Sequence, residues 1–155
     1  IEQIAPPEEL YTTPATAFVA QFMGCDNNFP AVYESPAESG DPEESEASAA
    51  GPRRIWLRAG GTPLLVVPHR IPDVAPGEEL RCYGRPEEFA IFAEDGDNRI
   101  PGKVVFRSFQ GANTLITVDT EVGELQVVSD RRLRREPGEQ VYVHVPSESL
   151  VLAGA

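Results

Sequence analysis

The chain contains 155 residues, and its 25 acidic and 13 basic side chains give a formal net charge of −12 at pH 7. A charge of this sign argues against nucleic acid or an anionic lipid surface as the main partner. The 13 glycines and 15 prolines interrupt the sequence too often for long helices, and no run approaches the roughly 18 apolar residues of a membrane span. The composition therefore predicts a mainly β fold.

The first 26 residues predict two short helices. Residues 6–12 open with prolines, which suit a first helical turn, and then place two glutamates where the helix dipole favours acids. A second helix is predicted from Pro14 to Gly24, with Phe18 and Phe22 four positions apart on one apolar face. Helices this short need tertiary contacts. The sequence also begins without an initiator methionine or a signal-peptide pattern, so we expect a fragment of a longer protein.

An acidic segment follows a short apolar run at 29–33. Residues 34–51 contain six acids, no Lys or Arg and no aromatic side chain. Such a segment cannot bury apolar surface, and it is predicted to be a flexible, solvated loop.

Beyond Arg53 the sequence alternates with a period of two. The clearest segment is 140–145, where three valines face one way and Gln140, Tyr142 and His144 the other, as in a half-buried antiparallel strand. Turn residues at 59–61, 75–77, 95–98 and 136–138 separate the segments and favour a small barrel or two barrel-like lobes. The predicted strands are 54–58, 63–67, 79–83, 89–93, 102–109, 114–118, 124–129, 140–145 and 150–152.

The sequence lacks the usual nucleotide-hydrolysing motif. A P-loop needs Lys followed by Ser or Thr, because the ammonium reaches the terminal phosphates and the hydroxyl holds magnesium. Lys103 is the single lysine, and Val104 follows it. Neither a GxGxxG helix start nor a GxSxG elbow is present. Acid pairs such as Glu87-Glu88 offer a carboxylate couple for an enzyme, but such pairs are more typical of turns and solvated faces.

The remaining reactive side chains carry no recognised spacing. Cys25 and Cys82 are predicted to be reduced thiols, since two cysteines make no disulfide framework or zinc motif. His69 and His144 lie 75 positions apart and are predicted to be structural or surface residues. The arginine-rich run 131–135 either receives an oxyanion or an acidic partner, or forms a charged hairpin end, because a Glu-Pro-Gly turn follows it.

Three stretches together resemble one family. The first 31 residues, with IEQ, EELY, FVA and NFPA in this order, are similar to the segment that ends the ATPase domain of bacterial importer-type ABC transporters. GRPEEFAIF at 84–92 resembles a strand entry of the TOBE domain, the transport-associated OB-fold region that follows that ATPase. PGKVVFRSFQGANTLITVDTEVGELQVV from 101 and PGEQVYVHVPSESLVL from 137 resemble its last lobe. The acidic insertion has no counterpart in that pattern.

The resemblance implies OB-fold-like barrel lobes of TOBE/MOP type after two linker helices. Residues 1–26 would be the linker from a missing ATPase domain, and 27–155 the regulatory domain. It implies a non-catalytic part that holds two ATPase subunits together, with ATP and magnesium bound by the missing domain and no cofactor here. It further implies a homodimer, permease subunits as partners and a cytoplasmic position on the inner face of the membrane.

Two interpretations of the candidate residues stay open. In the first, the valines of 140–145 pack the last lobe, which self-associates, while Arg85 and Glu87 pair locally or across the dimer. In the second, hydroxyls and arginines converge on a small oxyanion such as molybdate or sulfate, as in related sensing domains. The residues singled out for a ligand or an interface are Arg85, Glu87, Arg107, Ser108, Thr114, Arg131, Val141, Val143 and Val145.

Overall fold

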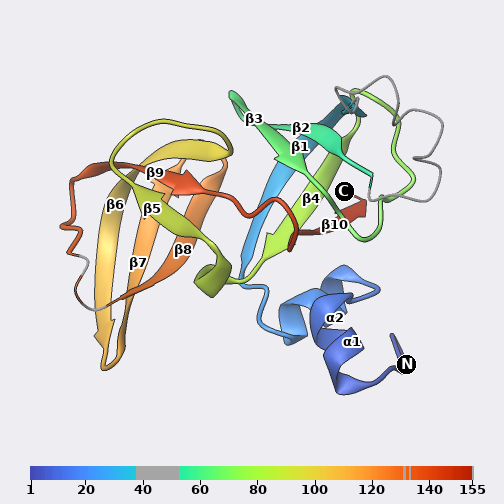
Figure 1. Cartoon of the computed structure of the whole chain (residues 1–155), viewed down its shortest axis with the longest axis horizontal. Helices are drawn as coiled ribbons and strands as arrows, with labels where there is room; N and C mark the ends of the chain where they lie inside the picture. The colour runs from blue at the N-terminus through green and yellow to red at the C-terminus, as the bar shows by residue number, and fades with distance from the viewer. Residues whose placement is uncertain (38–52, 131, 133, 155) are drawn as a thin grey trace, which may run out of the picture.

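The computed structural model describes residues 1–37, 53–130, 132 and 134–154. Within these ranges it contains two short α-helices, one 3-10 turn and two five-stranded antiparallel sheets (Figure 1). The helices are α1 (Pro7–Thr12), α2 (Ala17–Phe22) and the 3-10 turn η2 (Pro86–Glu88). The strands are β1 (Asn27–Pro36), β2 (Ile55–Ala59), β3 (Thr62–Val66), β4 (Glu79–Gly84), β5 (Ala90–Phe92), β6 (Arg99–Gln110), β7 (Asn113–Thr120), β8 (Gly123–Asp130), β9 (Gln140–His144) and β10 (Val151–Gly154).

The prediction of a mainly β fold with two short leading helices is confirmed. Every predicted strand has a counterpart, with ends shifted by a few residues. The predicted loop at 34–51 is wrong in its first residues, because β1 continues to Pro36. Residues 38–51 lie outside the described ranges. Sequence reasoning missed β1 because Pro30 interrupts its alternation, and a proline argues against a central strand.

The chain folds as two halves with the same strand order. The first sheet runs β10-β4-β1-β2-β3 and the second β5-β9-β6-β7-β8, so β1 to β4 correspond to β6 to β9. The final strand of each half is exchanged: β5 follows β4 but pairs with β9, and β10 follows β9 but pairs with β4. The sequence carries the same repeat, since DNNFPA at 26–31 matches DNRIPG at 97–102. Each half is therefore completed by a strand of the other.

One apolar core joins the two halves. Phe29 and Leu80 of the first sheet belong to the same buried cluster as Ile100 and Leu125 of the second. A second, smaller cluster lies under α2, where Ala20 packs with residues of β4 and β10. Within the described ranges, no helix has the length and apolarity that crossing a bilayer requires.

Two buried asparagines join the sheets at their edges. Asn27, which begins β1, accepts a hydrogen bond from the backbone N–H of Gln126 in β8 and donates one to its carbonyl, both at 2.7 Å. Asn98, which precedes β6, makes the same pair with Leu65 of β3, at 2.8 and 2.7 Å. Each amide thus acts as one further strand residue on an edge that would otherwise stay open. Asn98 has a φ of 55°, a left-handed conformation that asparagine tolerates better than most residues.

Replacing Asn27 by Asp tests this amide clamp. The carboxylate keeps the shape but cannot donate to the Gln126 carbonyl, so a buried acceptor loses its partner. We expect the free energy of unfolding to fall by about 1–3 kcal/mol, measured by urea denaturation. Asn113→Asp, at the exposed start of β7, is the matched control and should leave the midpoint unchanged. Equal midpoints for the two variants would contradict the role assigned to Asn27.

Candidate functional site

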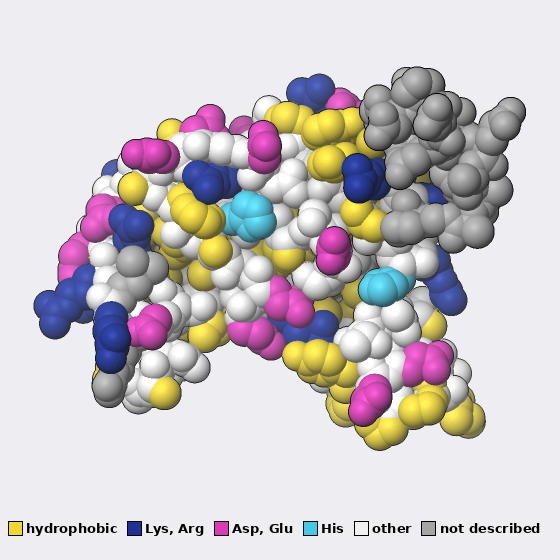
Figure 2. All heavy atoms as spheres, in the orientation of Figure 1, with side chains coloured by type: hydrophobic (Ala, Val, Ile, Leu, Met, Phe, Trp, Pro, Cys, Tyr) yellow, Lys and Arg dark blue, Asp and Glu magenta, His cyan; other side chains and the backbone are white. Residues whose placement is uncertain are grey.

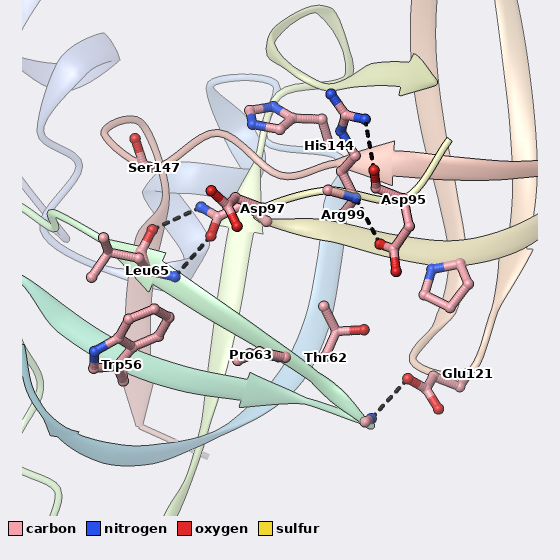
Figure 3. Close-up of a pocket in the computed structure, with 14 residues that line it drawn as sticks. Trp56, Thr62, Pro63, Leu65, Asp95, Asp97, Arg99, Glu121, His144 and Ser147 are labelled. Atoms are coloured by element: carbon pink, nitrogen blue, oxygen red, sulfur yellow. Dashed lines mark hydrogen bonds between the residues drawn. The ribbon is translucent and has the colours of Figure 1, made fainter. Parts of the chain in front are cut away.

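A cleft of about 750 Å³ opens between the two halves. The β2–β3 hairpin forms one wall, the loop before β6 forms the other, and the β7–β8 turn closes one end (Figure 3). Its lining residues are Trp56, Gly61, Thr62, Pro63, Leu65, Asp95, Gly96, Asp97, Asn98, Arg99, Pro101, Glu121, His144 and Ser147.

The loop before β6 is held in place from both sides. The Asn98 side chain is bonded to Leu65, and its backbone carbonyl accepts a hydrogen bond from Val145 at 2.8 Å. The Arg99 guanidinium donates to the carbonyls of Glu94 and Asp95, at 2.9 and 3.3 Å. The backbone that carries Asp95 and Asp97 is thus hydrogen-bonded to segments of both halves (Figure 3).

The far end of the cleft depends on a contact between two turns. Glu121, in the β7–β8 turn, accepts a hydrogen bond from the backbone N–H of Gly61 at 2.8 Å. Gly60 has a φ of +57°, and a Cβ there would come within 2.5 Å of the Glu121 carboxyl carbon. The β2–β3 turn therefore favours glycine at this position because of its left-handed backbone, and a Cβ there would require the exposed Glu121 side chain to shift.

The cleft is acidic. Asp95, Asp97 and Glu121 are exposed, and Arg99 is the one permanently charged cation among the lining residues. Burial, with a smaller contribution from the positive charge of Arg99, lowers the pKa of His144 below its ordinary value, so this imidazole is neutral at pH 7. Three carboxylates against one guanidinium favour a cationic ligand over an anionic one.

The walls of the acidic cleft also carry an aromatic side chain, Trp56. Trp56 is 37% exposed on the hairpin wall, and indole is the aromatic ring that attracts cations most strongly. Arg99 already stacks on Phe92, 3.7 Å from the ring centre. Within the described ranges, no three His, Cys, Asp or Glu side chains form a group that could hold a metal ion. The chemistry of the cleft is therefore suited to binding a small organic cation.

Ser108 and Thr114, two of the residues predicted for an oxyanion, do not converge on one site. Ser108 of β6 is paired with Leu115, one position from Thr114, and neighbouring positions on a strand point to opposite faces. Ser108 and Thr114 therefore lie on opposite sides of the sheet. Arg107 forms an ion pair with Glu136 at 2.8 Å, and Arg131 lies outside the described residues.

The residues predicted for an interface lie mostly inside the molecule. Val141, Val143 and Val145 are fully buried in the core of this one chain. Arg85 is buried and donates to the carbonyls of Tyr11 and Met23. Glu87 is exposed, and no ion pair joins it to Arg85 among the described residues. The predicted local ion pair between Arg85 and Glu87 is thus wrong, because the Arg85 guanidinium points toward α1 and α2 instead.

The prediction of two unpaired thiols is confirmed, since Cys25 and Cys82 are both free and buried. Burial raises the pKa of both. His69 is exposed, as predicted for a surface histidine, whereas His144 lines the cleft. Sequence reasoning missed the cleft because its residues come from segments far apart. The one available signal was the repeated Asp-Asn pair at 26–27 and 97–98.

The lowered pKa of His144 predicts a pH dependence of stability. The unfolded chain, with a value near 6.5, binds this proton more readily than the folded protein. Stability should therefore fall as the pH drops below 6.5 and be unaffected by this group above it. We expect His144→Gln to lose less stability than the wild type between pH 7.5 and 5.5 in urea titrations. His69→Gln serves as the control and should retain the wild-type difference; identical behaviour of all three proteins would contradict the prediction.

Comparison with known protein families finds a match in the second half of the chain. Residues 85–152 match the family model of the TOBE domain. The chain is 28% identical over 132 residues to the spermidine/putrescine import ATP-binding protein PotA of Marinobacter nauticus, covering 84% of this chain and 31% of that one. For the protein of the same name from Rubrobacter xylanophilus, identity is 29% over 159 aligned positions, with shares of 99% and 38%. The chain thus spans about a third of the length of these curated relatives.

A solved structure supports the fold. The cytoplasmic molybdate-binding protein ModG, in a form with molybdate bound, superposes with a TM-score of 0.66 at 14% identity, covering 84% of this chain and 96% of that one. At this identity the likeness concerns the fold alone, and it confirms the expected OB-fold-like, TOBE/MOP-like architecture. Residues 85–152 thus match the TOBE domain family, and most of the chain is similar to a part, about a third in length, of spermidine/putrescine import ATP-binding proteins.

Proposed function

We propose that this chain is the non-catalytic regulatory part of an ATP-binding subunit of a bacterial ABC importer. The observation that carries the proposal is the TOBE match on 85–152, in a chain that spans about a third of its ATP-binding relatives. ATP and magnesium would be bound by an ATPase domain elsewhere in the same polypeptide, and this chain holds no cofactor of its own. A coupling of roughly 1–3 kcal/mol between the two parts would alter turnover several-fold or more.

The proposed arrangement assigns a role to each segment. Residues 1–26 are the helical linker to the ATPase domain, and 27–155 are the regulatory domain. The partners are that ATPase domain, the transmembrane permease subunits and a second copy of the subunit. The assembly works at the cytoplasmic face of the bacterial membrane, where the subunit is peripheral.

Self-association is tested on the chain itself. Val141, Val143 and Val145 are buried within one copy, so a dimer must use other surfaces and needs to bury more than about 1,000 Å². We expect sedimentation equilibrium at micromolar concentration to give twice the 16.9 kDa mass of the chain. A monomer throughout the concentration range would remove the second copy from the proposal.

We further propose that the cleft between the halves receives the regulating ligand, and that this ligand is a small organic amine. Asp95, Asp97 and Glu121 supply carboxylates for ammonium groups, and the exposed Trp56 supplies an aromatic face for the methylene chain or the cation. The names of the relatives, which refer to spermidine and putrescine, agree with this class of solute.

An oxyanion ligand is the second candidate. It is favoured by the fold shared with the molybdate-binding protein ModG. The acidic charge of the cleft argues against it, because an oxyanion would face three carboxylates and one guanidinium.

Calorimetric titration distinguishes between the amine and the oxyanion as the ligand of the cleft. At pH 7.5 and low salt, we expect saturable binding of spermidine or putrescine and none of molybdate or sulfate. The double variant Asp97→Asn, Glu121→Gln should weaken amine binding by about tenfold, or roughly 1.4 kcal/mol, while the amide oxygen introduced at position 121 still accepts the Gly61 hydrogen bond. Glu8→Gln, exposed on α1, should bind as the wild type does. Molybdate binding without amine binding would overturn the amine in favour of the oxyanion.

A further inference from the structure

Arg85 lies directly after β4 and is 3% exposed. Its Nε donates to the carbonyl of Met23 at 3.3 Å, and its Nη2 donates to the carbonyl of Tyr11. The guanidinium carbon also lies 3.6 Å from the centre of the Tyr11 ring. One side chain at the end of β4 therefore contacts both parts of the N-terminal helical segment.

Both carbonyls that Arg85 contacts lie at the C-terminal end of a helix. Tyr11 lies in the last turn of α1, and Met23 is the C-cap of α2. Helix C-termini carry unpaired carbonyls and a partial negative charge, which a cation stabilises. Neither helix has a basic residue in its last turn. Arg85 supplies this missing charge to both helices at once.

The attachment of α1 depends unusually strongly on this contact. None of the six residues of α1 is buried, whereas α2 buries Val19 and Ala20. Helices of this length do not persist without tertiary contacts. The Gln3 side chain bonds to Ala15 at 2.7 Å, which ties parts of the segment to each other rather than to the sheets. The further contact of Arg70 with the Ala15 carbonyl is long, at 3.4 Å, and exposed.

The outer face of the segment is apolar. Phe18 and Phe22 stack on each other and are 63% and 80% exposed. Hydrophobic side chains gather on the helical segment, at the lower right of Figure 2. The N-terminal helical segment thus contacts Arg85 through its helix ends and exposes Phe18 and Phe22 on another face.

We propose that Arg85 is a latch that docks α1 on the rest of the chain, and that its engagement sets how tightly this domain is coupled to the ATPase. The coupling rests on the proposed function, whereas the latch itself is a property of this chain. Among the described residues Arg85 forms no ion pair, so its release breaks two hydrogen bonds and a ring contact but no salt bridge.

Hydrogen exchange tests the latch on this chain. The amides of Leu10 in α1 and of its C-cap Thr13 are bonded to the carbonyls of the N-cap Pro6 and of Glu9. We expect Arg85→Lys to raise their exchange rates at least tenfold, because one ammonium cannot reproduce the two-carbonyl fork and the ring stacking. Amides of β1 and β4 should keep their protection.

Arg81→Lys provides the matched control. Arg81 lies in β4, four residues before Arg85, and donates to the Asn28 side chain, so its variant should leave α1 exchange at the wild-type rate. Unchanged exchange of α1 in both Arg85→Lys and Arg85→Met would overturn the latch. Loss of protection spreading through β1 and β4 in both variants would also overturn it, since Arg85 would then hold the fold rather than the segment.

The coupling is tested in the full-length ATP-binding subunit. We expect Arg85→Lys to keep basal ATP hydrolysis within about twofold and to abolish the change in rate caused by spermidine. An unaltered spermidine response, together with faster α1 exchange, would overturn the coupling. Absence of ATP hydrolysis in the wild-type subunit would instead refute the proposed function and leave the exchange result standing.

Discussion

The side chains of Asn27 and Asn98 each occupy the free edge of the sheet to which they do not belong. A primary amide presents an N–H donor and a carbonyl acceptor side by side, at nearly the spacing of a peptide group, so it can complete an edge strand without adding a strand. Both amides are buried and doubly bonded. Together with the exchange of β5 and β10, they make each half incomplete without the other, which explains why a single core runs through both.

The acidic cleft is a consequence of this assembly. Asn98 holds the loop of Asp95 and Asp97 against the β2–β3 hairpin, and Glu121 bridges the two turns at the far end. The same constraint that closes the sheet edges therefore collects carboxylates from separate segments around one space. Because the supporting backbone is bonded from both halves, the positions from which Asp95 and Asp97 project are fixed, and the proposed amine would meet a loop that is already ordered.

Arg85 illustrates how the environment of a charge decides its role. In the sequence it stands close to two glutamates, a pattern typical of a charged turn. In the structure the 3-10 turn η2 follows it, and the guanidinium points to the C-terminal ends of α1 and α2. A cation at two helix ends stabilises both, so the side chain acts on the helical segment rather than on its sequence neighbours.

The sequence alone determined the β character, the two leading helices and the positions of most strands, because alternation, prolines and turn glycines act over a few residues. Sequence reasoning missed β1, whose alternation is interrupted by Pro30, and the duplication that the two Asp-Asn pairs indicate. Only the tertiary structure decided which sheet receives β5 and β10, where Arg85 points, and which acids meet around the cleft. These features depend on contacts between segments up to about a hundred positions apart, such as Asn27 with Gln126, and local periodicity carries no information about such pairings.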